Sequence, residues 1–438
     1  MTAATTPSNS IKTLALAALL LFAGTAAAFA ETTNAVPQTN ARPTAAQAVQ
    51  NPLPKLSRPN PAEAQLVLQR YADNIEVNTF IDDMVSRYDF DATALHTLFA
   101  SANYSPTIAK LVLPAPSPAI KNWQVYRARF LDSVRINAGV KFWLENRATL
   151  ERAYQQYGVP PEVIVGIIGV ETMYGRYMGN FRVLDALTTL TFDYPDTPNR
   201  AEREKTFRKN LEDYLIWTRN VQIDPTTVRG SYTGAIGIPQ FLPSSIVQYA
   251  VDFEGNDHID LRTSTADAIG SVAHFLSEHG WSAGQPVVWK ISHDAGSLGI
   301  AQAAADGQPE PHWPLAQLLR AGMLLDEPGL DMIGEAATPV LVIDLPSPSE
   351  PTEYMLGLQN FYVLTRYNRS FFYALAVYQL GETVKARVDA QTLGMQAGHA
   401  PAQASQLNPG GARGANPGGS TPSATNGPAQ AGKTPVDR

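Results

Sequence analysis

The clearest hydrophobic pattern in the chain is a run over residues 163–170 in which every position is apolar or glycine. A helix with no polar stripe is expected to be buried on all sides. Pro161 suits its first turn, where a backbone N–H has no helical partner, and Gly175 is the expected C-terminal cap. Glu171 then lies in the last turn, on the same face as Ile168.

Helical spacing recurs elsewhere in the chain. Residues 62–113 predict a small helical subdomain, because apolar side chains recur there three or four residues apart. One such group is Ala64, Val67, Leu68 and Tyr71, and a second is Phe80, Met84 and Tyr88. Residues 266–281 predict an amphipathic helix, and residues 370–380 a further one.

Strand patterns are confined to one region. Residues 287–291 and 340–345 read as strands within a segment, about 284–350, that is rich in proline and glycine. The chain is therefore expected to be mostly α, with a small α/β insertion.

The two ends have a different composition. Residues 1–30 predict a secretory signal, with Lys12, an apolar stretch and an Ala-x-Ala cleavage site at 28–30; the alternative is an uncleaved membrane anchor. Residues 31–60 are expected to be a flexible linker, and residues 387–438 a disordered tail, since both have few large apolar side chains. The chain between them, residues 61–386, is expected to carry the catalytic domain.

Charge and cysteine content narrow the function. The net charge of −7 gives no electrostatic basis for binding nucleic acid. The sequence has no cysteine, which excludes disulfides, thiol catalysis and a lipid anchor on a cysteine.

Glu171 is the strongest catalytic candidate. Burial among isoleucines and the negative end of the helix dipole both disfavour its carboxylate, so both raise its pKa. An acid that stays protonated near neutral pH can donate a proton to a leaving oxygen. The structural alternative is an ion pair with Arg176 or Arg182.

Residues 252–260 resemble a calcium-binding loop. Asp252, Glu254 and Asn256 offer oxygen ligands at alternate positions, and the backbone carbonyl of His258 offers another. Asp257 takes the place of the usual glycine, although aspartate tolerates the left-handed conformation. The alternative is an acidic turn that binds no ion.

Four segments carry a resemblance to a known family: 157–162 (YGVPPE), 166–179 (GIIGVETMYGRYMG), 230–245 and 360–370. Together they resemble the lytic murein transglycosylase B family, over roughly residues 60–385. The resemblance implies a lysozyme-like helical core and, without an anchoring cysteine, a non-lipoprotein member that acts in the periplasm.

The resemblance also assigns roles by position. It implies that Glu171 is the catalytic acid and that the substrate groove contains Tyr126, Arg200, Ser231, Gln240, Tyr367, Asn368 and Tyr373. It further implies a structural calcium ion, with Asp267 completing the ligands from the 252–260 loop. Asn199 and Phe275 depart from the family pattern, which has arginine and, in some relatives, tyrosine there. Two structural alternatives stay open: Ser231 and Asn368 could each simply cap a helix.

The implied reaction needs one carboxyl group. Glu171 would protonate the oxygen between N-acetylmuramic acid and N-acetylglucosamine, and its carboxylate would then deprotonate the muramyl C6 hydroxyl, which closes a 1,6-anhydro ring. A hydrolase would need a second carboxylate, such as Asp185 or Asp193. Two further alternatives are a calcium-stabilised scaffold that binds peptidoglycan without catalysis and a calcium sensor. The implied partners are peptidoglycan strands and, among proteins, those of cell-wall synthesis.

Overall fold

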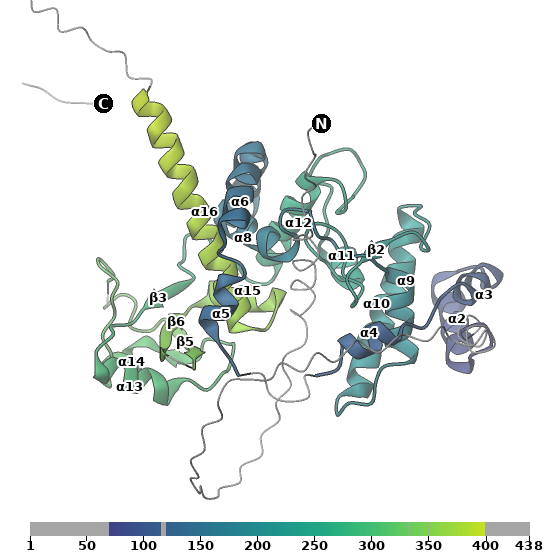
Figure 1. Ribbon diagram of the computed structural model, residues 1–438, viewed down its shortest axis with the longest axis horizontal. Helices are drawn as coiled ribbons and strands as arrows, with labels where there is room; N and C mark the ends of the chain where they lie inside the picture. Colours follow the sequence, from purple (N-terminus) through teal and green to yellow (C-terminus); the bar gives the residue numbers. More distant parts are fainter. Residues whose placement is uncertain (1–69, 115–119, 332, 349, 399–438) are drawn as a thin grey trace, which may run out of the picture. The chain divides into compact units, whose positions relative to one another are not determined.

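The computed structural model describes residues 70–114, 120–331, 333–348 and 350–398, and their structure is mainly helical (Figure 1). The signal and linker predicted for residues 1–60 lie outside the described residues, as do Ala64, Val67 and Leu68. No helix among the described residues is long and apolar enough to cross a membrane.

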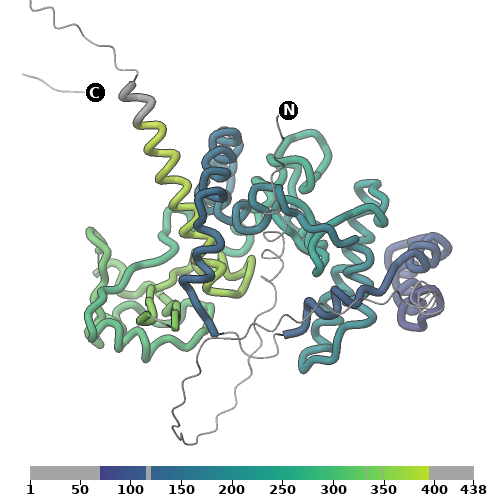
Figure 2. The backbone as a smooth tube through the Cα atoms, viewed as in Figure 1, coloured from purple at the N-terminus to yellow at the C-terminus, as the bar shows by residue number. Residues whose placement is uncertain are grey.

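The described part of the predicted N-terminal subdomain, residues 70–113, contains the helices α2 (Ile75–Tyr88), α3 (Ala92–Ala100) and α4 (Pro106–Leu111). Asn74, Asp91 and Ser105 cap their N-termini through side-chain oxygens, as expected of these residue types. Helix α4 packs on α9 (Val183–Phe192), as the chain trace in Figure 2 shows. The subdomain therefore rests directly on the helical core.

Helix α8 (Pro161–Thr172) is the buried helix that the apolar run predicted, with residues 163–170 all buried. It crosses α16 (Phe371–Gly398) at glycine contacts. A Cβ atom on Gly166 would overlap the carbonyl oxygen of Val377, and one on Gly381 would overlap that of Glu162. These glycines let the two helices approach closely.

The remaining core elements surround this pair. They are α5 (Trp123–Ala128), α6 (Ser133–Glu145), α7 (Arg147–Tyr157), α9, α10 (Arg200–Asn220), α11 (Pro243–Tyr249), α12 (Thr265–Glu278) and α15 (Gln359–Tyr367). Two short strands, β1 (Phe181–Arg182) and β2 (Arg229–Gly230), pair antiparallel.

The end of α8 differs from the prediction. The helix stops at Thr172, and Met173 and Tyr174 adopt left-handed backbone angles, with φ of 52° and 61°, before Gly175 does so at 81°. The hydroxyl of Thr172 accepts a hydrogen bond from the Gly175 N–H at 2.9 Å and donates one to the Ile238 carbonyl at 2.8 Å. A contact from a distant loop therefore ends the helix three residues before the glycine.

The α/β insertion contains β3 (Val288–Lys290), α13 (Ala295–Ala304), β4 (Trp313–Pro314), α14 (Leu315–Arg320), β5 (Pro339–Ser347) and β6 (Glu350–Gly357). Its four strands have the order β3-β6-β5-β4. Strand β6 was not predicted, and it extends the insertion beyond residue 350.

Alternate residues of β5 serve two different cores, because successive side chains of a strand point to opposite faces. Val340 and Val342 pack against α13 and α14, whereas Leu341, Ile343 and Leu345 join the main core. The sheet is thus covered by the insertion's own helices on one face and by the helical core on the other.

The predicted boundary of the tail at residue 387 is wrong, since α16 continues to Gly398. Val384 and Val388 are buried, so the helix still packs in the core at the predicted boundary. The rest of the predicted tail, 399–438, lies outside the described residues.

Candidate active site

Glu171 meets Tyr373 where the last turn of α8 passes the first turn of α16. The Tyr373 hydroxyl donates a hydrogen bond of 2.5 Å to Oε1 of Glu171. The Glu171 side chain is half-buried, and loss of hydration raises its pKa to about 7, while the Tyr373 hydrogen bond opposes that rise. Glu171 is therefore an acid that exchanges its proton near neutral pH.

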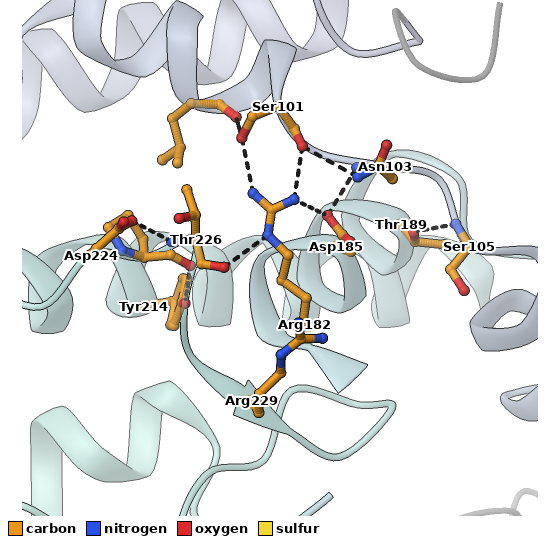
Figure 3. A network of polar contacts seen from close by, with 12 residues as sticks. Ser101, Asn103, Ser105, Arg182, Asp185, Thr189, Tyr214, Asp224, Thr226 and Arg229 are labelled. Atoms are coloured by element: carbon orange, nitrogen blue, oxygen red, sulfur yellow. Dashed lines mark hydrogen bonds and ion pairs between the residues drawn. The ribbon is translucent and has the colours of Figure 1, made fainter. Parts of the chain in front are cut away.

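Neither proposed ion pair of Glu171 forms. Arg176 is exposed. Arg182 instead binds Asp185, the Ser101 carbonyl and the Thr226 carbonyl (Figure 3). No cation among the described residues pairs with Glu171, so the Tyr373 hydrogen bond is what offsets the cost of burying its charge.

Two further tyrosines lie within the electrostatic reach of Glu171. The Tyr367 hydroxyl donates to the Pro239 carbonyl at 2.5 Å, and its ring lies nearly parallel to that of Tyr373, with centroids 6.5 Å apart. Burial and then the Glu171 charge raise the pKa values of Tyr367, Tyr373 and Tyr126. All three hydroxyls therefore remain protonated hydrogen-bond donors.

Tyr126, on α5, is held by a cluster of aromatic rings. Its ring centroid lies 5.2 Å from that of Phe130 and 5.5 Å from that of Phe372. This packing holds Tyr126, a predicted groove residue, against the first turn of α16.

The loop 230–245 lies against the end of α8. Gln240, at a left-handed φ of 54°, donates through Nε2 to the Met178 carbonyl at 3.2 Å, and Thr172 bonds Ile238 in the same loop. Ser231 forms no hydrogen bond with Glu171 and caps no helix. Its hydroxyl accepts the N–H groups of Thr233 and Ala235 and so stabilises the loop's own turn.

Two predicted groove residues make local contacts instead. Asn368 accepts the Ser370 N–H at 3.1 Å through Oδ1, but it does not cap α16, because the Ser370 hydroxyl takes that place by accepting the Tyr373 N–H at 3.3 Å. Arg200 lies exposed at the start of α10 and pairs with Glu204 at 2.6 Å. The structure thus brings Glu171, Tyr126, Tyr367 and Tyr373 together, but it joins Arg200 to none of them.

The two carboxylates that a hydrolase could use are occupied elsewhere. Asp185 accepts the Asn103 N–H at 2.9 Å and pairs with Arg182 (Figure 3). Asp193 pairs with Arg70 and accepts the Tyr71 hydroxyl at 2.7 Å. Both carboxylates fasten the N-terminal segment to α9.

The 252–260 loop forms a compact turn. Asp252 accepts the backbone N–H groups of Gly255, Asn256 and Asp257, and Asp257 adopts a φ of 62°, the left-handed conformation that aspartate tolerates. Asp267 is fully buried beneath the loop. Its two oxygens accept three backbone N–H groups at 2.8–3.0 Å, so it organises the loop from below.

The chemistry of this loop suits a hard cation. Glu254, Asn256, Asp260 and Thr263 line one cavity of about 460 Å³ and offer oxygen atoms. Within the described part of the chain, however, no three His, Cys, Asp or Glu side chains come close enough together to hold a metal ion. The donor types fit calcium, although they are not drawn together around one point.

The sequence analysis did not predict the hydrogen bond from Thr172 to Ile238 or the packing of two phenylalanine rings against Tyr367. The ring centroids of Phe275 and Phe241 lie 5.0 and 5.9 Å from that of Tyr367. Phe275 was noted only as a departure from a tyrosine. No local signal could have revealed these contacts, because each joins segments at least 66 residues apart.

Glu171 is a half-buried carboxylic acid with a pKa near neutral, and protonated tyrosines surround it on a helical core. This arrangement is typical of an enzyme that acts by donating a proton. The chain belongs to the lytic transglycosylases: the family model described as a transglycosylase SLT domain matches residues 72–382. The lysozyme-like helical core that the sequence predicted is thereby confirmed.

Known members are similar over most of the chain. Membrane-bound lytic murein transglycosylase B of Escherichia coli is 40% identical over 325 residues, which is 72% of this chain and 84% of that protein. The structure of soluble lytic transglycosylase SltB1 from Pseudomonas aeruginosa, at 40% identity, covers 71% of this chain and 99% of its own, with a TM-score of 0.64. Escherichia coli Slt35 in complex with calcium, at 38% identity, covers 73% and 95%, with a TM-score of 0.64.

A more distant member is also similar in structure. The structure of SltB3 from Pseudomonas aeruginosa in complex with NAG-anhNAM-pentapeptide is 26% identical, covers 73% of this chain and 79% of its own, and has a TM-score of 0.59.

Proposed function

We propose that this chain cleaves peptidoglycan between N-acetylmuramic acid and N-acetylglucosamine and leaves 1,6-anhydromuramyl ends. The observation that carries the proposal is the single acid, Glu171, with its pKa raised to about 7 and its hydrogen bond to Tyr373. The anhydro sugar in the SltB3 complex supports the same product.

Glu171 acts twice. In its neutral form it donates its proton to the glycosidic oxygen, and the bond to the muramyl C1 breaks. The resulting carboxylate then removes the proton of the muramyl C6 hydroxyl, whose oxygen bonds C1. The nucleophile is part of the substrate, so no water and no second carboxylate are required.

The surrounding donors fit this cycle. Tyr373 hydrogen-bonds the carboxylate form of Glu171 and stabilises it between the two proton transfers. Tyr367 and Tyr126 provide flat, protonated surfaces beside the acid, which suit sugar rings. Asn368, Ser231, Gln240 and Arg200 remain proposed substrate contacts farther along the groove.

The test is mass spectrometry of the muropeptides released from purified sacculi. We expect products lighter by one water than those of a hydrolase. The matched controls are Asp185→Asn and Asp193→Asn, which remove a hydrolase's second carboxylate but should preserve the anhydro product. Reducing ends, or loss of the product's anhydro character in either control, would contradict the proposal.

We further propose that the chain acts in the periplasm, either free or held by an uncleaved N-terminal segment, and beside proteins of cell-wall synthesis. We propose as well that the 252–260 loop binds calcium as a structural ion, through Asp252, Glu254, Asn256 and the His258 carbonyl, with Asp267 supporting them. The calcium complex of Slt35 supports this part.

A further inference from the structure

A second concave surface lies between the N-terminal subdomain and α10. It is a groove of about 830 Å³, with α3 as one wall and the end of α10 and the following residues, 218–226, as the other. Its floor is apolar and includes Leu95, Leu98, Leu215 and Ile223. None of the residues grouped around Glu171 lines it, so it is separate from the active site.

The two walls are fixed relative to each other. Arg182 donates to the Ser101 hydroxyl and carbonyl at the end of α3, and also to the Thr226 carbonyl on the opposite wall (Figure 3). A cleft held open by a charged clamp keeps its shape without a ligand, which lowers the cost of binding.

The rim of the groove is acidic. Asp89, Asp91 and Asp224 are exposed, and none of them forms an ion pair within the described part of the chain. The cation on the rim, Arg219, is engaged: it donates to the Tyr88 carbonyl and stacks on the Phe90 ring at 3.9 Å. Asp91 and Asp224 accept backbone N–H groups, those of Ala94 and Thr226. An apolar floor beneath exposed carboxylates that have no paired cation is complementary to an apolar segment that carries Lys or Arg.

The chain's own N-terminus has that composition. Residues 32–62 contain no Asp or Glu and carry Arg42, Lys55 and Arg58. Within them, residues 51–60 (NPLPKLSRPN) place Leu53 and Leu56 around Lys55, between prolines that favour an extended backbone. We name residues 51–60 the basic segment.

The basic segment is also within reach. The Arg70 guanidinium lies 4.4 Å from the ring centroid of Tyr104, only three residues beyond Ser101 on the groove wall. Twelve peptide units separate residue 58 from Arg70, and they can span up to about 40 Å. We propose that the groove binds the basic segment of the same chain, with its leucines on the apolar floor and Lys55 and Arg58 at the acidic rim.

Disulfide trapping in the full chain tests this, because the sequence contains no cysteine of its own. The test variant is Leu56→Cys with Thr97→Cys; Thr97 lies exposed on the groove wall. Two control variants change one partner each: Val36→Cys with Thr97→Cys, and Leu56→Cys with Thr79→Cys on the exposed face of α2.

We expect the test variant to form an intrachain disulfide at least tenfold faster than either control. Adding Leu53→Asp should reduce that rate to the control level, while thermal unfolding by circular dichroism stays unchanged. Equal rates in test and control variants would overturn the proposal. A disulfide that joins two chains would also overturn it, because the occupant would then be a second copy.

Discussion

Replacing Glu171 by glutamine should stabilise the protein in a pH-dependent way. The folded-state pKa of about 7 exceeds the ordinary value of 4.5 by about 2.5 pH units. At about 1.36 kcal/mol per pH unit, the ionised side chain costs about 3 kcal/mol of folding free energy. Because Glu171 is only half-buried and stays partly hydrated, we expect about 1–3 kcal/mol.

The sign follows from proton binding. Between pH 4.5 and 7 the folded protein binds the proton more tightly than the unfolded chain, so the contribution of Glu171 to stability falls as pH rises. Below pH 4.5 both states are protonated and the cost disappears. Glutamine cannot ionise, and it can still accept the Tyr373 hydrogen bond. Glu171→Gln should therefore match the wild type at pH 4 and exceed it at pH 8, while turnover is abolished.

The assay is urea unfolding followed by circular dichroism at pH 4, 6 and 8. Glu162→Gln is a suitable control, since Glu162 pairs with Lys385 at 2.8 Å and its loss should not stabilise the protein at pH 8. A stability difference for Glu171→Gln that is the same at all three pH values would refute the raised pKa. Retained turnover would refute the mechanism.

Three further predictions follow from the same contacts. Tyr373→Phe removes a hydrogen bond that favours the Glu171 carboxylate, so the alkaline limb of kcat/KM should move up by about 1–2 pH units; an unmoved limb would contradict this. Gly166→Ala should destabilise the protein by about 1–3 kcal/mol and reduce activity by separating α8 from α16, whereas Gly299→Ala, which meets no neighbour, should be neutral or stabilising in thermal unfolding. Millimolar calcium should raise the Tm of the wild type, and Asp252→Asn should weaken that rise; equal shifts in both would argue against the loop as the site.

The sequence determined the elements whose signals are local. The uninterrupted apolar run required a buried helix, and α8 is buried throughout. The position of Glu171 in its last turn already implied desolvation and a raised pKa. The tight turn in the 252–260 loop and the left-handed conformation of Asp257 could also be predicted from the local sequence, because a tight turn depends on the backbone preferences of its own residues.

The tertiary structure decided which partners meet. Thr172 ends α8 because it bonds Ile238, 66 residues away, and Glu171 finds Tyr373 rather than an arginine because glycines bring α8 against α16. Strand β6 was not predicted; it lies between β3 and β5, and its place depends on pairing with both of them. Arg182 donates to the Ser101 and Thr226 carbonyls and so connects three separate segments of the chain. A local pattern records what one element prefers, whereas these contacts depend on the simultaneous packing of several elements.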